Sequence, residues 1–434
     1  MAADKMSDYE ADREYFGPLA DIPEESLVLL ASDICERVLD VPGTNGKRVS
    51  QIFGGYNIIN VIQLDGIQLV IRVTLCDRGS DEKKAAAADA LESQVATMRF
   101  VAQNTSIPVP EVYDFDTSDD NVIGTPYVCM SFVPGTPVSQ IWIRDCDVVL
   151  REQLRLNILK SVAGLMAQLS QFTFDKIGAI SDVDPSSASL SACYNWQDGP
   201  DGIPYTVASG PFDTTAAYLE ANYAHWQDGS WGRAERKIME AITPFSAIYD
   251  ESSHFVLCHP KLDPQNVMVD SQGNVTGLLD WDMAMTMPQC LGYAAYPSWI
   301  TRDWDPLMYA WPMEETEDSP ESLGCYRIYY NNQMGRELEW KGDWKFTEYS
   351  HITEALWIAL LSRPNRLEIC RKLVQIALHT DKNTALGVLD DIGEDCYEKE
   401  DWNQLENNLR QLVSKRSKPK PDTGDMIQVA GDSL

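Results

Sequence analysis

The chain lacks the features by which membrane-spanning, secreted and zinc-binding proteins are usually identified. Its longest apolar runs are about six residues, whereas a membrane-spanning helix needs ~20. The first residues contain no apolar stretch typical of a secretory signal peptide. The 10 cysteines are scattered singly without a C-x-x-C pair, which argues against zinc ribbons and thioredoxin-like redox sites. These absences predict a protein with reduced thiols, no membrane partner and a cytoplasmic location.

Basic residues are also in short supply. The 434 residues include 66 acidic and 35 basic side chains, so the formal net charge is −31. A body this acidic repels phosphate backbones, which argues against nucleic acid as a partner. The same charge favours a cationic small molecule as substrate. The hydrophobic fraction of 44% is ordinary for a globular protein, and the chain is long enough to bury a large core.

A β-rich block occupies the first third of the chain. Residues 1–25 are acidic and poorly patterned, so we expect them to be loose, and apolar residues at helical spacing predict a helix over 26–39. Beyond them, β-branched runs joined by Gly-Gly and Asp-Gly turns predict strands and one long helix. The expected strands cover 49–54, 57–64, 67–74, 111–115 and 126–132, and the expected helix covers 81–103. Pro134-Gly135 then breaks the pattern.

Helical spacing dominates the rest of the chain. Helices are expected at 150–172, 233–249, 348–362, 363–378 and 402–412. Between them, the polar stretch 182–215 predicts a surface loop, and 255–282 predicts a short β segment. We therefore predict four regions, which are an acidic N-terminal segment with a helix (1–44), an N lobe (45–135), a helical C lobe with the β segment (136–412) and a disordered tail (413–434).

The densest group of polar residues lies in the predicted β segment, which contains His259-Pro-Lys-Leu-Asp-Pro-Gln-Asn266. The pattern predicts a polar loop, a strand, a turn at 271–274 and a second strand that ends before Asp280-Trp-Asp282. Such a hairpin places Asn266 and Asp280 side by side at its open end. Amide and carboxylate oxygens suit Mg²⁺, a hard cation that also binds substrate phosphates. The sequence therefore predicts a magnesium site at this end of the hairpin.

This motif resembles the catalytic loop of the aminoglycoside phosphotransferase family, H-G-D-x-x-x-x-N followed by D-[WF]-[DE]. Gly292–Pro306 is similar to stretches of filamentous-fungal members. The family shares the protein-kinase-like fold with choline kinases, so the resemblance implies a bilobal α+β protein with a small antiparallel β-sheet N lobe and a mainly helical C lobe. It implies ATP as phosphate donor and Mg²⁺ held by Asn266 and Asp280. Asp282 would be a supporting residue or ligand of a second metal, and His259 would brace the loop.

The N-terminal block carries further family-like features. Gly54 and Gly55 resemble the nucleotide-covering loop, where glycine lets the backbone approach phosphates closely. Arg72 stands where the family has a phosphate-contacting lysine, and Glu92 stands where it has the acidic partner on the following helix. The strand before Pro134 resembles the hinge whose backbone binds adenine. The residues of this expected hinge are Met130, Ser131 and Phe132.

One position departs from the family pattern. The catalytic aspartate, two residues after the histidine, is replaced by Lys261, and Asp263 follows two residues later. An ammonium group cannot accept a proton at neutral pH unless burial strongly lowers its pKa.

Three interpretations of this exchange stay open. In the first, Asp263 orients the acceptor and Lys261 contacts the γ-phosphate, which gives an ATP- and Mg²⁺-dependent phosphotransferase acting on a hydroxyl of a small molecule. In the second, the protein is a pseudokinase that binds nucleotide or a partner without transferring phosphate. In the third, the fold performs other nucleotidyl-transfer chemistry, such as adenylyl transfer. We favour the first.

Overall fold

The computed structural model describes residues 8–41, 45–76, 78–144, 146–183, 189–249, 254–305 and 307–414. They form two compact units, each assembled from three segments of the chain. The first unit draws on residues 1–158, 174–214 and 257–286, and the second on 159–173, 215–256 and 287–434. The segment with the predicted catalytic motif therefore belongs to the same unit as the N-terminal strands, whereas the expected division near residue 135 separates them.

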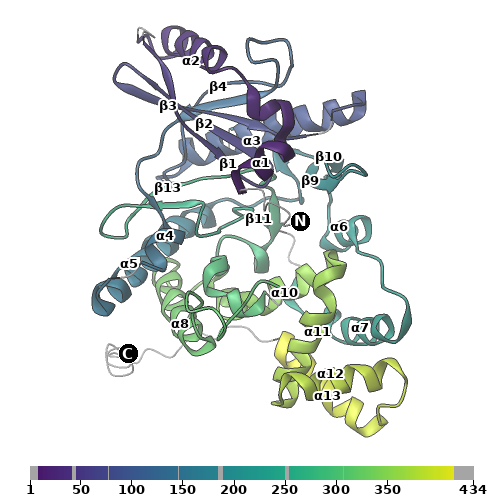
Figure 1. Ribbon diagram of the computed structural model, residues 1–434. Coiled ribbons are helices and arrows are strands. Elements are labelled where there is room, and N and C mark those ends of the chain that lie inside the picture. The colour runs from purple at the N-terminus through teal and green to yellow at the C-terminus, as the bar shows by residue number, and fades with distance from the viewer. Residues whose placement is uncertain are drawn as a thin grey trace, which may run out of the picture. The chain divides into compact units, whose positions relative to one another are not determined.

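A five-stranded antiparallel sheet forms the centre of the first unit, with the order β1-β2-β3-β5-β4 (Figure 1). The strands are β1 (Lys47–Phe53), β2 (Asn57–Leu64), β3 (Ile67–Thr74), β4 (Val112–Asp116) and β5 (Tyr127–Ser131). Hairpins join the first three strands, and the turn between β2 and β3 has Gly66 at φ +84°, a conformation that favours glycine. The predicted bounds of β2 and β3 agree with the structure because regular β-branched runs and a tight turn specify them locally.

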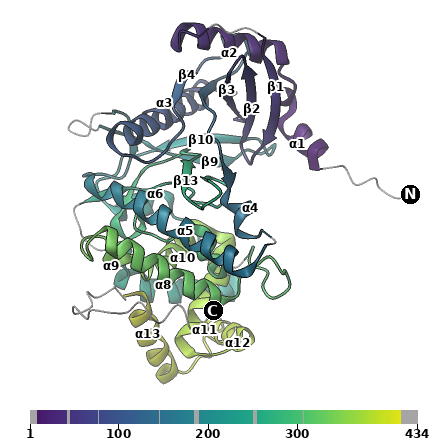
Figure 2. The ribbon, with the colours of Figure 1, turned by 90° about the vertical axis from the view of Figure 1, so that its left-hand side faces the viewer.

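Helices cover both faces of this sheet. Leu27, Leu30 and Ile34 of α2 (Glu24–Val38) pack with apolar residues of β2 and β3 in one buried cluster (Figure 2). The helix α3 (Asp81–Asn104) lies on the other side. Successive side chains of a strand point to opposite faces, so Leu69, Ile71 and Val73 enter the α2 cluster. The alternate residues of β3, among them Arg72, therefore face α3.

Residues 8–25 are ordered and anchored by buried Phe16, Ala20 and Ile22, so the expectation of a loose segment is wrong for them, whereas residues 1–7 lie outside the described part of the chain. They form α1 (Asp8–Phe16), a 3₁₀ turn (Gly17–Asp21) and the start of α2. Phe16 is 1% exposed in a cluster with Ile58 and Leu75, and its ring centroid lies 5.5 Å from that of Phe53. The acidic composition concealed this packing, because a single buried aromatic side chain produces no periodic pattern.

The polar stretch 182–215 also differs from its prediction. About half of its described part is strand, and β9 (Cys193–Asp198) and β10 (Pro204–Ser209) form an antiparallel hairpin that packs against α3. The other strands, and the two helices that follow β6, are β6 (Thr136–Pro137), α4 (Val138–Trp142), α5 (Val148–Met166), β7 (Ala179–Ile180), β8 (Leu190–Ser191), β11 (Phe255–Leu257), β12 (Val267–Val269), β13 (Val275–Leu278) and β14 (Thr286–Pro288). Strands β13, β12 and β6 form a small sheet in that order.

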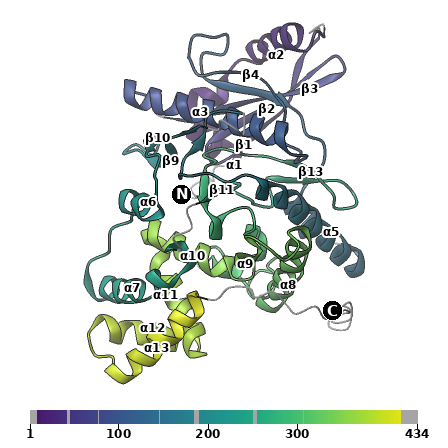
Figure 3. The ribbon, with the colours of Figure 1, turned by 180° about the vertical axis from the view of Figure 1, so that it is seen from behind.

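The second unit is helical. Its helices are α6 (Thr215–Asn222), α7 (Gly229–Ile242), α8 (Pro320–Glu337), α9 (Trp344–Thr347), α10 (Ser350–Leu361), α11 (Arg363–Leu378), α12 (Lys382–Gly393) and α13 (Lys399–Val413). Further 3₁₀ turns lie at Ala167–Gln171, Thr243–Phe245, Ala247–Tyr249, Gln289–Leu291, Ser298–Ile300 and Arg302–Trp304. Figure 3 shows α12 and α13 beside α11, against which both pack.

These elements confirm the predicted α+β class. Of the predicted tail, Val413 ends α13, and all residues after Ser414 lie outside the described part of the chain. Across the residues that can be described, no helix combines the length and the apolar character needed to cross a bilayer.

Phe16→Ala tests the packing of the N-terminal segment. We expect a loss of ~3–5 kcal/mol in the free energy of unfolding of the segment, because the change deletes a buried aromatic ring. Leu29→Ala, at a position on α2 that is 59% exposed, is the control and should change it by less than ~0.5 kcal/mol. Denaturant unfolding of the two variants measures the difference, and equal small effects would show that the segment is loose.

Candidate functional site

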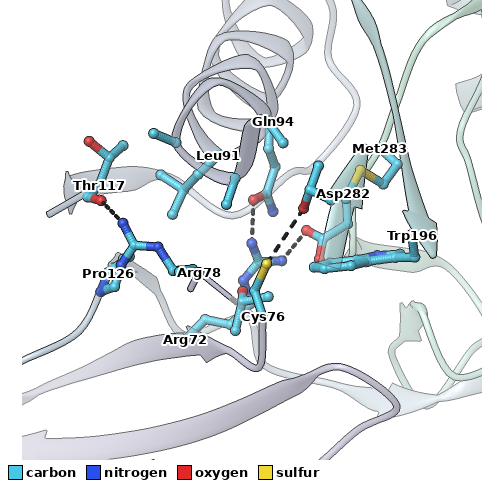
Figure 4. A pocket seen from close by; sticks show the side chains of 15 residues that line it. Arg72, Cys76, Arg78, Leu91, Gln94, Thr117, Pro126, Trp196, Asp282 and Met283 are labelled. Carbon is cyan, nitrogen blue, oxygen red and sulfur yellow. Dashed lines mark hydrogen bonds and ion pairs between the residues drawn. The ribbon is translucent and has the colours of Figure 1, made fainter. Parts of the chain in front are cut away.

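A buried ion pair joins β3 to the turn after β13. The guanidinium of Arg72 bonds through Nη1 to Asp282 Oδ1 and through Nη2 to Gln94 Oε1 (Figure 4). The same Nη1 lies 3.9 Å from Asp280 Oδ1. Arg72 is 6% exposed, so these contacts lie where water screens charge poorly. The structure thus brings the predicted phosphate-contacting residue to the predicted metal ligand.

The predicted helical partner of Arg72 is wrong. Glu92 is exposed on α3, whereas Gln94 is buried and bonds to the guanidinium. Two residues along a helix are ~200° apart, so the two side chains occupy nearly opposite faces. Gln94 lies four residues from buried Ala90 and from buried Met98, and this helical spacing was the signal that could have found it. Because Gln94 is neutral, Asp282 supplies the charge that balances Arg72.

His259 joins the loop 259–266 to the segment that follows β13. The ring is 3% exposed, with Nε2 located 2.9 Å from the carbonyl oxygen of Leu279 and Nδ1 accepting the Lys261 N–H at 3.2 Å. Burial lowers the pKa of His259 to about 4, so the ring is neutral at pH 7 and Nε2 carries the proton that it donates. Its ring also meets Trp281 edge to face at 4.5 Å.

Asn266 and Asp280 lie at the same end of the β12–β13 hairpin, as their spacing predicts. Val267 pairs with Leu278, and the next residue, Leu279, donates its N–H to the carbonyl of Asn266 at 2.8 Å. The side-chain amide of Asn266 donates to the carbonyl of Lys261 at 3.1 Å. This bond uses the amide nitrogen and leaves the amide oxygen as the atom that could bind a cation.

The surroundings of Asp280 destabilise the ionised form of its carboxyl group. Its pKa is raised to about 6, mainly by burial and then by repulsion from Asp282, although Arg72 and Lys261 act in the opposite direction. Its backbone is left-handed at φ +61°, which aspartate tolerates better than most residues. A bound cation would stabilise the ionised form, so the oxygens of Asp280 and Asn266 fit Mg²⁺, which is usually held by one or two carboxylates together with phosphates and water.

Asp282 does not fit the role of an open metal ligand that the resemblance allowed. Its Oδ1 bonds to Arg72, and its Oδ2 accepts a hydrogen bond from Asn57 Nδ2 at 3.0 Å. Both oxygens are therefore engaged. The part of the chain that the structure describes contains no group of three or more histidine, cysteine or acidic side chains able to hold a metal by themselves.

Two aromatic residues that the sequence analysis missed connect the glycine turn to the catalytic loop. The ammonium of Lys261, an exposed residue, lies 5.5 Å from the ring centroid of Tyr56. Tyr56 stacks on Trp196 of β9, with centroids 4.9 Å apart and planes 16° apart. Asp263 is half-buried, and its N–H donates to the carbonyl of Lys261 at 2.7 Å. The assignment of 182–215 to a surface loop hid Trp196.

The glycine turn follows β1, and the expected hinge lies at the end of β5. Gly54 donates its N–H to the carbonyl of Asn57 at 2.8 Å, and a Cβ added to Gly55 would meet no described atom within 4 Å, which leaves space for a ligand. In the hinge, Ser131 already donates its N–H to Glu111 at 2.9 Å, so this amide is not available to adenine. Met130 is buried in β5, and Phe132 follows the strand at 39% exposure.

Comparison with known proteins places the chain in a family. The model of the phosphotransferase enzyme family matches residues 65–311, more than half of the chain. The chain belongs to this family. The match includes Arg72, α3 and the whole His259–Asp282 motif, so the resemblance drawn from that motif is confirmed.

Relatives of the chain are fungal proteins. Clavilactone A biosynthesis cluster protein Y of Ampulloclitocybe clavipes is 24% identical over 258 residues, which cover 55% of this chain and 60% of that protein. Altered inheritance of mitochondria protein 9, mitochondrial, of Clavispora lusitaniae is 21% identical over 253 residues, which cover 56% of this chain and 40% of that protein. The chain thus spans less than two thirds of the length of these relatives.

A solved structure with a similar chain is a putative aminoglycoside phosphotransferase from Ralstonia eutropha. It is 16% identical with a TM-score of 0.45, and the alignment covers 91% of this chain and 99% of that one.

Asp280→Asn tests the unfavourable setting of this carboxylate. The folded-state pKa of about 6 lies above the unfolded value of ~3.9, so the stability contributed by the protonated form is present below pH ~4 and is lost as the pH rises through about 6. Without divalent cations, the variant should therefore be more stable than the wild type at pH 7.5, by up to ~3 kcal/mol, and similar at pH 4.

Melting temperatures across this pH range measure the effect. Asp198→Asn removes an exposed carboxylate at the end of β9 and is the control, for which no such pH-dependent gain is expected. A pH-independent difference between Asp280→Asn and the wild type would contradict the raised pKa.

Proposed function

We propose that the chain is an ATP- and Mg²⁺-dependent phosphotransferase that acts on a hydroxyl group of a small molecule. One observation carries the proposal: the guanidinium of Arg72 lies 3.9 Å from Asp280, at the hairpin end that also carries Asn266. A polyphosphate chelated to a divalent cation needs such a combination of cationic side chains and an acidic metal ligand. Family membership supports the reaction class.

The proposed roles follow from these positions. Arg72 supplies positive charge to the α- and β-phosphate oxygens while its Nη atoms stay bonded to Asp282 and Gln94. Asn266 and Asp280 hold Mg²⁺, which neutralises charge on the phosphates when it is bound. The turn at Gly54-Gly55 covers the phosphates, and the backbone after Ser131 binds adenine.

Asp263 orients the acceptor hydroxyl, and Lys261 binds the γ-phosphate. The acceptor oxygen forms a bond to the γ-phosphorus as the bond to the β–γ bridging oxygen breaks, and ADP departs. The hydroxyl proton passes to Asp263 or to the transferred phosphate. The loose transition state of this reaction depends more on positioning and charge than on base strength, so an acid at this shifted position suffices.

The exchange at position 261 also supports a second candidate, a nucleotide-binding pseudokinase. The loop keeps its backbone contacts through His259 and Asn266, while the residue where the family has its catalytic acid is a lysine located over Tyr56. Adenylyl transfer on the same site is a third, weaker candidate.

Substrate and location are further proposals. The net charge of −31 favours a cationic acceptor. A cytoplasmic location stays a prediction from cysteine usage, and one relative carries a mitochondrial name.

Nucleotide binding tests the site before any acceptor is known. ATP at a hundred times its dissociation constant should stabilise the protein by ~2.7 kcal/mol, with a rise in melting temperature that is larger in the presence of Mg²⁺. Asp280→Asn should lose the Mg²⁺-dependent part of the rise, whereas Asp198→Asn should keep it. If millimolar ATP did not raise the melting temperature, or raised it equally with and without Mg²⁺, the proposed site would be contradicted.

Asp263→Asn and Lys261→Asp distinguish transfer from binding alone. In an assay of ADP production over a panel of hydroxyl compounds, Asp263→Asn should lower turnover by at least ~10²-fold, because it removes the acid that orients the acceptor. Its nucleotide-dependent melting shift should stay unchanged. Wild-type turnover that survives Asp263→Asn would refute the role of this residue. Turnover that appears only in Lys261→Asp would identify a pseudokinase.

A further inference from the structure

A pocket of about 520 Å³, including its open mouth, lies between α3, the end of β3 and the β9–β10 hairpin (Figure 4). All of its lining residues belong to the first unit. Arg72 and Asp282 form one end of it. Neither the glycine turn nor the expected hinge contributes to the described lining, so the pocket is separate from the proposed adenine site.

Apolar side chains of α3 form part of the pocket lining. They are Ala87, Ala88 and Leu91, and the small alanine side chains leave the room that larger residues would fill. Trp196 of β9 also lines the pocket and is held in place by its stack on Tyr56. An aromatic ring is the ligand group that gains most from such surroundings, because it buries a large apolar area in one plane.

Cationic side chains also line the pocket, in a chain with a net charge of −31. Among the residues that the structure describes, the lining includes two guanidinium groups, Arg72 and Arg78, and one carboxylate, Asp282, which already pairs with Arg72. Arg78 donates through Nη2 to the carbonyl of Thr117 at 2.8 Å. Its Nη1 pairs with Asp119, which is 52% exposed, so water screens this pair.

Both guanidinium groups keep a buried donor unused. Within the described residues, Nε of Arg72 and Nε of Arg78 are buried and have no hydrogen-bond partner. A buried donor without an acceptor costs roughly 1–3 kcal/mol, so such groups are rarely left in this state without a ligand or a water molecule. An anionic group in the pocket would supply the missing acceptor.

We propose that this pocket binds a small aromatic anion, with the ring between α3 and Trp196 and the anionic group at Arg78. Since Arg72 and Asp282 also line the pocket, the ligand would change the affinity of the nucleotide site, and the nucleotide would change the affinity of the pocket by the same factor. This coupling rests on the proposed function, whereas the binding of the anion does not.

Fluorescence titration with 1-anilinonaphthalene-8-sulfonate, without nucleotide, tests the binding. We expect saturable binding to the wild type and at least tenfold weaker binding to Ala88→Trp, which fills the pocket. Ala85→Trp places the same side chain at an exposed position of α3 outside the lining and should bind as the wild type does. Arg78→Gln should also weaken binding at least tenfold, and it removes charge without adding bulk should Ala88→Trp fail to fold.

The uncharged probe N-phenyl-1-naphthylamine separates the ring from the anionic group, and it should bind at least tenfold more weakly than the sulfonate. No saturable binding of the sulfonate, or equal binding to Ala88→Trp and Ala85→Trp, would overturn the site. Equal binding of the two probes would overturn its selectivity for anions. Sulfonate binding in a protein that shows no ATP-dependent melting shift would refute the proposed function alone.

Discussion

The buried pair between Arg72 and Asp282 is the interaction on which the first unit depends. It joins the sheet to the turn after β13, although the two residues are 210 positions apart in the chain. Removing one partner of a buried pair leaves an uncompensated charge and typically costs 3–5 kcal/mol. The pair therefore fixes where the turn after β13 lies relative to β3, and it brings Asp280 within 3.9 Å of the guanidinium.

Asp280 is the residue for which this arrangement is least favourable. Burial and the nearby Asp282 raise its pKa, and its backbone is left-handed. Carboxylates whose ionised form is destabilised by burial and a nearby acid usually serve function rather than stability. A bound cation would stabilise the ionised form and offset the free energy that this burial costs the fold. The same reasoning explains why the turn has two acids, one on each side of Trp281, of which Asp282 pairs with Arg72.

The catalytic loop keeps its shape independently of the side chain at position 261. His259 and Asn266 bind the backbone N–H and carbonyl of Lys261, so these contacts are unaffected by the identity of its side chain. A change from acid to base at this position therefore alters the chemistry of the site and leaves its scaffold in place. Tyr56 and Trp196 give the lysine a defined place over an aromatic pair.

The sequence alone determined the elements that short-range patterns specify. β2, β3 and α11 have the bounds that periodicity predicts, and the spacing from Asn266 to Asp280 predicted their meeting because a hairpin is a local structure. The family motif determined the reaction class for the same reason, since its residues lie in one continuous segment.

Only the tertiary structure decided which side chains meet from distant segments. It brought Gln94, and not Glu92, to Arg72, and it packed Phe16 against Ile58 of β2. It also brought Trp196 to Tyr56. Such contacts depend on the orientation of whole elements about one another, which is set by the summed packing of a buried core and leaves no periodic trace in the sequence of either segment.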